Sequence, residues 1–370
     1  MRSIAILVQS SQVGGVQRVI RNLANGLASL GHQIAILSCD DRGGAFDAMS
    51  SSVSVVDFAV RGSHGDGKVA MAIPQIRSYV KRFRPDVLLA APGLSGQFAL
   101  VSANGTRTRV VVMIDNRISI IRAKSVMHRI AYGMGARLYR RASAIVLAHD
   151  SALEDFRRCV PCCADKATRI YHPLIPDNLS SLVAEEPDFV LPDSGRLIVA
   201  AGRFVPEKDF STLLRAFSLL DDEAADIRLL ILGEGKLRSD LECEARNLNI
   251  TSHVLMPGAV TNVYKYFSRA DVFVLTSVSE AFGNVLIEAL ASGCPVVATR
   301  CESGGPQEIL ANGRYGELCK QGDAEGIASA LLRVLRGKGV PTREELSSRG
   351  NEFSVAESCR QYSRLIEGLV

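Results

Sequence analysis

Residues 272–288 read VFVLTSVSEAFGNVLIE and contain the pattern on which the fold of the whole chain is built. The apolar run at 272–276 predicts a buried strand, and the polar and small residues that follow it predict a loop. A helix is expected to begin near Phe282 and to carry Glu288 in its first turns. A strand, a loop and a helix of this size form the unit from which a parallel sheet covered by helices is assembled.

The same unit recurs along both halves of the chain. In the front half the expected strands are 4–9, 34–38, 53–58, 87–90, 110–114 and 144–148, with helices at 16–30, 69–84, 95–104, 125–141 and 151–158. In the back half the expected strands are 197–201, 229–232, 254–256, 272–276 and 296–299. Because a chain of 370 residues is long enough for two domains, we predict an α/β fold of two Rossmann-like α/β/α domains. They are expected to face each other across a cleft, since ligands of such sheets bind beyond the carboxyl ends of the strands.

Prolines mark the expected boundary between the domains. The alternation is interrupted by four of them, with acidic and serine residues in between: Pro173, Pro176, Pro187 and Pro192. We predict an N-terminal domain over 1–175, a linker over 176–193 and a second domain over 194–352. The last helix, within 353–370, is expected to cross back to the N-terminal domain.

The composition narrows the location of the protein. No apolar run approaches the ~20 residues of a membrane-spanning helix. The start of the chain is apolar over only about five residues, which favours a first strand over a secretion signal. Nine cysteines, mostly alone among apolar residues, are typical of free thiols in a reducing cytoplasm. Cys159, Cys162 and Cys163 lie close together, but no second cysteine or histidine pair follows at ligand spacing, so no metal site is predicted.

The charge is unevenly distributed along the chain. The net charge of +4 combines a basic front half, 1–190, with an acidic back half, 191–370. The stretch 116–149 has no acidic residue and seven basic ones: Arg117, Arg122, Lys124, Arg129, Arg137, Arg140 and Arg141. Such a field favours an anionic substrate or peripheral association with an anionic inner membrane surface. Nucleic acid is not expected, since tryptophan is absent, aromatic residues are few and no nucleic-acid-binding motif accompanies the charge.

Three loops carry residue types that suit a phosphate ligand. Gly14 and Gly15 lie between the first expected strand and a helix, where backbone N–H groups can approach a phosphate; the alternative is a simple turn. Arg203 and Lys208 follow the first strand of the second domain, and two cations there suit a diphosphate; the alternative is a solvated loop. Gly233, after the next strand, indicates close approach of a ligand or of backbone. None of these loops matches a Walker lysine loop or the spaced glycines of nicotinamide-dependent enzymes.

Glu280 and Glu288 are the strongest candidates for a functional pair. With a helix that begins near Phe282, the eight residues between them correspond to about 12 Å along the axis. The sugar and the ribose of a nucleotide sugar are separated by a comparable span, so one carboxylate could hold sugar hydroxyls and the other ribose hydroxyls, with helix N–H groups facing the phosphates. The alternative is one Glu that stabilises the helix dipole and one exposed Glu on the next face. The residues alone leave the two interpretations even.

Taken together, these motifs resemble glycosyltransferase family 4, a family of retaining enzymes with the GT-B fold, over nearly the whole chain. Glu280 and Glu288 match the E-x7-E signature of the family, with its Phe-Gly present as Phe282-Gly283. The Gly14-Gly15 turn resembles the glycine turn of the family's first strand. Gly202-Arg203 with Lys208 resembles its diphosphate-binding pair, and 303–309 resembles a segment beside the donor.

The resemblance implies transfer of a sugar from a UDP- or GDP-type nucleotide sugar with retained anomeric configuration, without a cofactor or an obligatory metal. It implies that Arg203 and Lys208 neutralise the departing diphosphate. Glu280 is implied to bind the donor sugar and Glu288 the ribose. The amides implied to bind the phosphates and the sugar are those of Gly15, Phe282, Gly283 and Asn284. The leaving phosphate helps to deprotonate the acceptor in this family, so no enzymic nucleophile is named.

Some positions depart from the family pattern. Asp115 stands where many members have a histidine, and an ionised Asp cannot donate a hydrogen bond. His149 and His172 stand where Ser and Asn are common, and a structural role is expected for each. The leading hypothesis is a hexosyl- or N-acetylhexosaminyltransferase that acts on a glycan or polyprenyl-linked acceptor in bacterial polysaccharide or glycolipid synthesis. The alternatives are a non-catalytic partner subunit of a glycan-synthesis complex and a sugar-nucleotide epimerase of the same fold.

Overall fold

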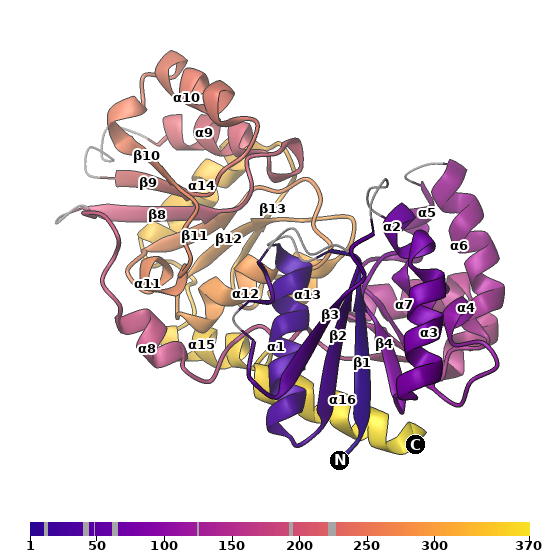
Figure 1. Cartoon of the computed structure of the whole chain (residues 1–370). Coiled ribbons are helices and arrows are strands. Elements are labelled where there is room, and N and C mark those ends of the chain that lie inside the picture. Colours follow the sequence, from indigo (N-terminus) through magenta and orange to yellow (C-terminus); the bar gives the residue numbers. More distant parts are fainter. Residues whose placement is uncertain are drawn as a thin grey trace. The chain divides into compact units, whose positions relative to one another are not determined.

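The chain forms two compact units in a computed structural model that describes residues 1–10, 14–39, 44–47, 49–60, 66–123, 126–191, 195–220 and 227–370. The first unit comprises Met1–Pro176 and Ser354–Val370, and the second comprises Asp177–Phe353 (Figure 1). Each unit contains one sheet in which every strand runs parallel to its neighbours. The structure thus confirms the predicted pair of parallel α/β domains.

The first unit is built on a seven-stranded sheet of order β3-β2-β1-β4-β5-β6-β7. The strands are β1 (Ser3–Val8), β2 (Gln33–Ser38), β3 (Val53–Asp57), β4 (Val87–Ala90), β5 (Arg109–Ile114), β6 (Ala144–Leu147) and β7 (Ala167–Arg169). The helices are α1 (Gly15–Ser29), α2 (Asp66–Met71), α3 (Ile73–Phe83), α4 (Ser95–Ser102), α5 (Ile118–Ala123), α6 (Val126–Tyr139), α7 (Asp150–Cys159), the 3-10 turn η1 (Pro161–Lys166) and α16 (Val355–Leu369).

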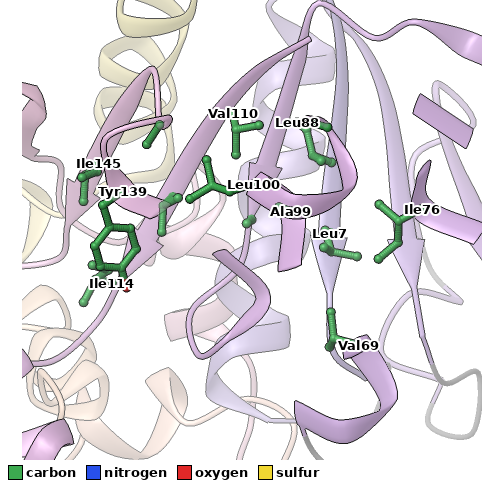
Figure 2. Packing of buried hydrophobic residues seen from close by; sticks show 14 of the residues in the cluster. Leu7, Val69, Ile76, Leu88, Ala99, Leu100, Val110, Ile114, Tyr139 and Ile145 are labelled. Atoms are coloured by element: carbon green, nitrogen blue, oxygen red, sulfur yellow. The ribbon is translucent and has the colours of Figure 1, made fainter. Parts of the chain in front are cut away.

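Alternation along the strands of this sheet divides its core into two layers. Ala5 and Leu7 of β1 face a cluster that includes side chains of α2, α3, α4, α6 and α7, whereas Ile4 and Ile6 face a cluster with α1 and α16. Successive residues of a strand point to opposite faces, so a run of apolar residues is needed when both faces are covered. Figure 2 shows part of the first cluster, where labelled side chains of β1, β4, β5 and β6 meet those of α2, α3, α4 and α6.

The C-terminal helix α16 belongs to the first unit. It packs against α1 (Figure 1), and its Tyr362 and Ile366 are fully buried in the same cluster as Ile4 and Ile6. The backbone N–H of Val355 donates to the carbonyl of Ile175 at 2.8 Å, which joins the start of the helix to the end of the first segment. The two ends of the chain therefore share one core.

The second unit is built on a six-stranded sheet of order β10-β9-β8-β11-β12-β13. The strands are β8 (Arg196–Ala201), β9 (Ile227–Leu232), β10 (Val254–Gly258), β11 (Val272–Leu275), β12 (Val296–Thr299) and β13 (Glu317–Cys319). The α-helices are α8 (Leu179–Ala184), α9 (Phe210–Ser218), α10 (Arg238–Asn247), α11 (Tyr264–Phe267), α12 (Asn284–Ala291), α13 (Gly305–Ile309), α14 (Ala324–Leu335) and α15 (Arg343–Asn351). The 3-10 turns are η2 (Pro206–Lys208), η4 (Thr251–His253) and η5 (Ala311–Gly313).

Short elements account for most differences from the predicted pattern. The edge strands β7 and β13 were not predicted, because three residues that include polar side chains carry no periodic signal. The single helix predicted at 69–84 is divided into α2 and α3, because Pro74 near the start of α3 has no N–H to continue a preceding helix.

The proline-rich segment 176–193 is attached to the second unit as far as residue 191, where the described part of it ends. It contains α8, and the Asp188 carboxylate accepts hydrogen bonds from Lys265 Nζ at 2.8 Å and from the Tyr266 hydroxyl at 2.9 Å. Asn262 Nδ2 also donates to the carbonyl of Leu182 at 2.7 Å. These contacts tie the described part of the segment to α11 and its preceding loop.

A substitution in α16 tests whether this helix is part of the first core. Ile366→Ala is expected to lower the free energy of unfolding by about 2–5 kcal/mol, because it removes a fully buried side chain. Arg364→Ala, on the exposed face of the same helix, is the matched control and should change it by less than about 0.5 kcal/mol. Urea unfolding followed by circular dichroism measures both. Equal midpoints for the two variants would contradict the shared core.

Candidate active site

The order of strands in the second sheet reverses between β8 and β11. The chain proceeds from β8 to β9 in one direction and later returns to place β11 on the other side of β8. At such a reversal the loops after the two neighbouring strands diverge, and open parallel sheets bind ligands there. The two loops concerned are residues 202–209, here the β8 loop, and residues 276–283, here the β11 loop.

The β8 loop has a fixed shape that positions Lys208. The N–H of Gly202 donates to the carbonyl of Leu232 at 2.9 Å, and the N–H of Phe204 donates to the backbone carbonyl of Glu234 at 2.8 Å. The loop then forms the turn η2 and ends at Asp209, whose φ of 46° lies in the left-handed region and whose carboxylate accepts from the first turn of α9. Asp tolerates this conformation better than most residues, and such strained positions cluster at functional sites.

Hydrogen bonds join the two loops directly. The Thr276 hydroxyl donates to the carbonyl of Lys208 at 3.0 Å, and the N–H of Val278 donates to the carbonyl of Glu207 at 3.0 Å. Both contacts use backbone atoms of the β8 loop, so they hold the course of the chain rather than one side chain. Lys208 therefore lies at the junction of the loops.

Lys208 and Glu280 form an ion pair at this junction. Lys208 Nζ donates to Glu280 Oε1, and the hydroxyl of Ser277 donates to the same oxygen at 2.7 Å. The exposed fractions of the Lys208 and Glu280 side chains are 17% and 12%. Because both side chains remain partly accessible to solvent, this pair can exchange partners with an incoming charged ligand more readily than a fully buried pair.

Two buried side chains contact the backbone of the β11 loop. The Thr299 hydroxyl donates to the carbonyl of Ser277 at 2.6 Å, and the Cys301 thiol lies 3.3 Å from the same oxygen. Burial, with the nearby Glu280 carboxylate, raises the pKa of Cys301 to about 11. Cys301 therefore remains a thiol at neutral pH and serves as a packing residue rather than a nucleophile.

The β11 loop ends at the N-terminus of α12. Gly283 is the N-cap residue and has a φ of +108°, a conformation that side chains strongly disfavour. The preceding Phe282 is buried and packs its ring 5.8 Å from that of Phe353. The helix begins at Asn284, not near Phe282 as predicted, because the glycine conformation interrupts the backbone geometry. Only residues 284–288 of the span from Glu280 to Glu288 are helical, so the estimate of about 12 Å, which assumed a mostly helical course, stays a prediction.

The helix-dipole alternative for the two glutamates also fails. Glu280 precedes the helix and is paired with Lys208, so it is not a first-turn residue. Glu288 is not exposed: only 2% of it is accessible to solvent. Glu288 is therefore not a solvated surface residue. Burial of a carboxyl group is costly unless its surroundings compensate for it.

The remaining predicted residues of this unit differ in their surroundings. Arg203 is exposed and makes no ion pair with the described residues, so its guanidinium is available to a ligand. Gly233 has a backbone reason to be glycine: a Cβ atom there would lie 1.9 Å from the carbonyl oxygen of Gly202. Of the two explanations that the sequence left open for Gly233, the structure supports close approach of backbone.

The predicted glycine turn of the first unit lies at the corresponding reversal of strand order, between β1 and β4. Gly14 is the N-cap of α1 and has an extended backbone, with φ of −174°, and Gly15 is the first residue of the helix. Both glycines are exposed. The first N–H groups of α1 therefore lie at the carboxyl end of β1, and the two glycines have no side chains that could cover them.

Asp115 has a partner that the sequence reasoning did not identify. His172 Nε2 lies 3.1 Å from Asp115 Oδ1, and the two side chains are 6% and 16% exposed. Asp115 directly follows β5 and His172 follows β7, so the parallel sheet brings both to the same edge. Burial, with the nearby Asp115 carboxylate, raises the pKa of Tyr362 in α16 well above its usual range.

His149 has the structural role that was expected. Its Nδ1 accepts a hydrogen bond from the backbone N–H of Ala152 at 3.2 Å, so it caps α7. The same role was expected of His172, but the pairing with Asp115 places an imidazole beside the position where the resembled family has its histidine. The His172-Pro173 sequence offered no periodic signal for that contact.

The basic stretch is partly used inside the first unit. Arg117 lies 3.7 Å from Asp155, and Arg122 donates to the carbonyl of Tyr132. The exposed members are Arg129, Arg137, Arg140 and Arg141, and Lys124 lies outside the described residues. None of the helices in the described parts of the chain has the length and apolar character that crossing a bilayer requires.

Comparison with known families and proteins yields matches along both units. Residues 14–171 match the family model described as glycosyl transferase 4-like domain, and residues 184–353 match glycosyl transferases group 1. The lipopolysaccharide core biosynthesis glycosyltransferase LpsE of Rhizobium meliloti (strain 1021) is 35% identical over 46% of this chain and 48% of its own length.

A second curated relative comes from Campylobacter jejuni subsp. jejuni serotype O:2. It is an N-acetylgalactosamine-N,N'-diacetylbacillosaminyl-diphospho-undecaprenol 4-alpha-N-acetylgalactosaminyltransferase, 30% identical over 62% of this chain and 61% of its own length. The matches thus span between about half and three fifths of the length of these two curated relatives.

A solved structure extends the likeness to the whole fold. HepE of Anabaena, crystallised in complex with UDP, superimposes with a TM-score of 0.78 at 18% sequence identity and covers 99% of this chain and 100% of its own. The two parallel-sheet units therefore have the GT-B fold.

Gly233 provides a test of the β8 loop geometry. Gly233→Ala is expected to lower the free energy of unfolding by about 3 kcal/mol, because the new methyl group collides with the Gly202 carbonyl and the backbone is strained. Gly322→Ala is the matched control, since Gly322 also has a positive φ but open space around it, and about 1 kcal/mol is expected. Guanidinium unfolding measures the difference. If both variants lose the same stability, the close approach of the loops after β8 and β9 is not real.

Proposed function

We propose that this protein is a retaining glycosyltransferase that transfers a sugar from a UDP- or GDP-type nucleotide sugar to a glycan or lipid-linked acceptor. The observation that carries the proposal is the Lys208–Glu280 pair at the strand reversal between β8 and β11, beside the N-terminus of α12. The two glycosyl transferase matches, which cover most of both units, support it independently.

The cations of the β8 loop are the proposed phosphate ligands. The diphosphate of the donor gains charge as the glycosidic bond to it breaks, and fixed cations stabilise that charge in the transition state. Arg203 is exposed and makes no ion pair with the described residues, and Lys208 can exchange the Glu280 carboxylate for a phosphate oxygen. These two side chains are proposed to act without an obligatory metal. The complex of HepE with UDP supports a uridine nucleotide as the first donor to examine.

Groups of the β11 loop and of α12 are proposed to bind the sugar and the nucleotide of the donor. When Lys208 turns to the phosphate, Glu280 becomes free to accept hydrogen bonds from hydroxyls of the donor sugar, while Ser277 keeps its carboxylate in position. The backbone N–H groups of residues 282–284 lie at the N-terminus of α12, where the helix dipole favours negative charge. Glu288 is proposed to bind the ribose, which requires its buried carboxyl group to meet the donor at the side of the helix.

The first unit is proposed to receive the acceptor. The Asp115–His172 pair supplies a carboxylate and an imidazole to a sugar hydroxyl of the acceptor, while the N–H groups of Gly15 and the first turn of α1 are proposed to bind a phosphate of the donor. In the retaining mechanism proposed here the leaving phosphate takes the acceptor proton, so none of these residues is a nucleophile. The Campylobacter relative is named for a diphospho-undecaprenol-linked glycan, which supports a lipid-linked acceptor. The exposed arginines at 129–141 suit the anionic surface on which such an acceptor lies.

Donor binding is the first test. UDP or GDP at about a hundredfold excess over its Kd should raise the Tm by about 5 °C or more, because a ligand that binds only the folded state stabilises it. Arg203→Ala and Lys208→Ala should reduce that shift, whereas Arg246→Ala, an exposed cation on α10, should keep it. The proposal fails if no nucleotide shifts the Tm, or if all three variants respond equally.

Product chemistry is the second test. The new glycosidic linkage is expected to have the anomeric configuration of the donor, as read from proton NMR coupling constants. Glu280→Gln should lower kcat/KM by about 100-fold or more, since it removes the carboxylate that orients the sugar, while the exposed Glu325→Gln on α14 should leave it unchanged.

Three results would contradict this reaction, and each has a distinct meaning. An inverted linkage would exclude the retaining mechanism. Conversion of the donor without any acceptor would indicate an epimerase. A bound donor with no turnover, restored by a second protein, would indicate a partner subunit.

A further inference from the structure

The turn η1 of the first unit presents two neighbouring thiols to different surroundings. Cys162 and Cys163 follow Pro161, and their Sγ atoms lie 3.7 Å apart. Cys162 is exposed, whereas Cys163 is buried in the core cluster that also contains Tyr139 and Phe156. One sulfur is thus accessible to a reagent from solvent, and the other lies directly behind it.

Arg140, from the end of α6, meets the exposed thiol. The guanidinium beside Cys162, together with the neighbouring Cys163 thiol, lowers the pKa of Cys162. Burial has the opposite effect on Cys163 and raises its pKa to about 11. Asp165 and Lys166 of the same turn are the other charged groups near the pair. A thiolate, not a thiol, is the reactive form of cysteine, so the two sulfurs differ in reactivity.

A lysine fixes the position of this arginine. Lys166 Nζ donates to the carbonyl of Arg140 at 2.7 Å and to that of Ala142 at 3.0 Å. These bonds tie the end of η1 to the backbone that leaves α6, and so they keep the backbone from which the exposed Arg140 side chain extends close to the turn that carries Cys162.

The third cysteine of the segment has the opposite environment. Cys159 Sγ lies 3.9 Å from the Asp155 carboxylate at the end of α7, and burial, with that negative charge, raises the pKa of Cys159. The local geometry thus selects Cys162 among three cysteines within five residues.

We propose that Cys162 and Cys163 form an oxidant-responsive dithiol, in which hydroperoxides oxidise Cys162 first and Cys163 then closes a reversible disulfide with it. This modification site lies outside the residues assigned to sugar transfer, and its test does not depend on that function.

The chemistry balances with a hydroperoxide as the oxidant. The Cys162 thiolate attacks the terminal oxygen of the peroxide, the O–O bond breaks, and the leaving oxygen takes a proton, which gives Cys162 sulfenic acid. Cys163 gives its proton to solvent and attacks the Cys162 sulfur, and the expelled hydroxide is protonated to water. With hydrogen peroxide, two thiols lose two electrons in total, and two water molecules are formed.

Adjacency makes such a disulfide easy to reduce. Consecutive Cα atoms are about 3.8 Å apart, whereas disulfides usually join Cα atoms about 4.4–6.8 Å apart. Strained disulfides are the labile ones that thiol reductants reverse. Oxidation would also consume the Cys162 sulfur that lies beside Arg140 and so change the surroundings of this cation at the end of α6.

Peptide mass spectrometry of the whole protein tests the proposal. The reduced chain is treated with a small excess of hydrogen peroxide, alkylated with iodoacetamide and digested with trypsin, which releases residues 159–166 as one peptide. The expected peptide has lost two hydrogens, carries one alkyl group on Cys159, and regains two alkylation sites after treatment with a thiol reductant. A disulfide from Cys159 to Cys162 or Cys163, or full alkylation of all three cysteines, would overturn the proposal.

Variants separate the roles of the two sulfurs and of the arginine. Cys163→Ser should prevent the disulfide and leave Cys162 as a sulfenic acid that dimedone labels. In the unoxidised chain iodoacetamide should alkylate Cys162 about threefold or more faster than Cys243, an exposed thiol on α10. Arg140→Ala should abolish that advantage, and Arg141→Ala should keep it. Equal rates for Cys162 and Cys243 in the unmodified chain, or no effect of Arg140→Ala, would overturn the assignment of Cys162 as the first thiol.

Discussion

The joining of the β8 and β11 loops is the constraint on which the candidate site depends. The strands β8 and β11 pair directly in the sheet, and two hydrogen bonds from Thr276 and Val278 to backbone carbonyls of the β8 loop join the loops that follow these strands. Without them, Lys208 and Glu280 would lie on separate flexible loops, and their pairing would cost side-chain and backbone entropy that an ion pair near the surface does not recover. The joined loops instead present a cation and a carboxylate in one place.

The parallel sheet is what makes this arrangement possible. Both units collect their polar loops at the carboxyl ends of the strands, while apolar runs bury both faces of the sheet. In the second unit the strand reversal coincides with Lys208 and Glu280, and in the first with the Gly14-Gly15 turn. The core can thus tolerate variation in the loops, and specificity for a particular sugar or acceptor resides in those loops.

The fold was predictable from sequence because short apolar runs of three to six residues recur along both halves of the chain. These runs became eleven of the thirteen strands with little change, whereas β7 and β13, each three residues long, gave no such signal. Lys208 and Glu280 were identified because each follows a clear strand. Other features of the site depend on packing that no local pattern contains. The start of α12 at Asn284 follows from the conformation of Gly283, the burial of Glu288 arises from the packing of this helix, and the Asp115–His172 pair depends on the unpredicted β7. Gly233 was selected correctly as a close approach, but only the Gly202 carbonyl shows what approaches it.

The joined loops of the second unit are proposed to bind a nucleoside diphosphate. Hydrogen–deuterium exchange of the whole chain, with and without UDP, gives a local readout of this binding. We expect slower exchange in peptides that cover residues 202–210 and 277–290, and unchanged exchange in peptides at the amino end of β13, such as 312–317. Slower exchange confined to other parts of the chain, with both loops unaffected at saturating UDP, would contradict it.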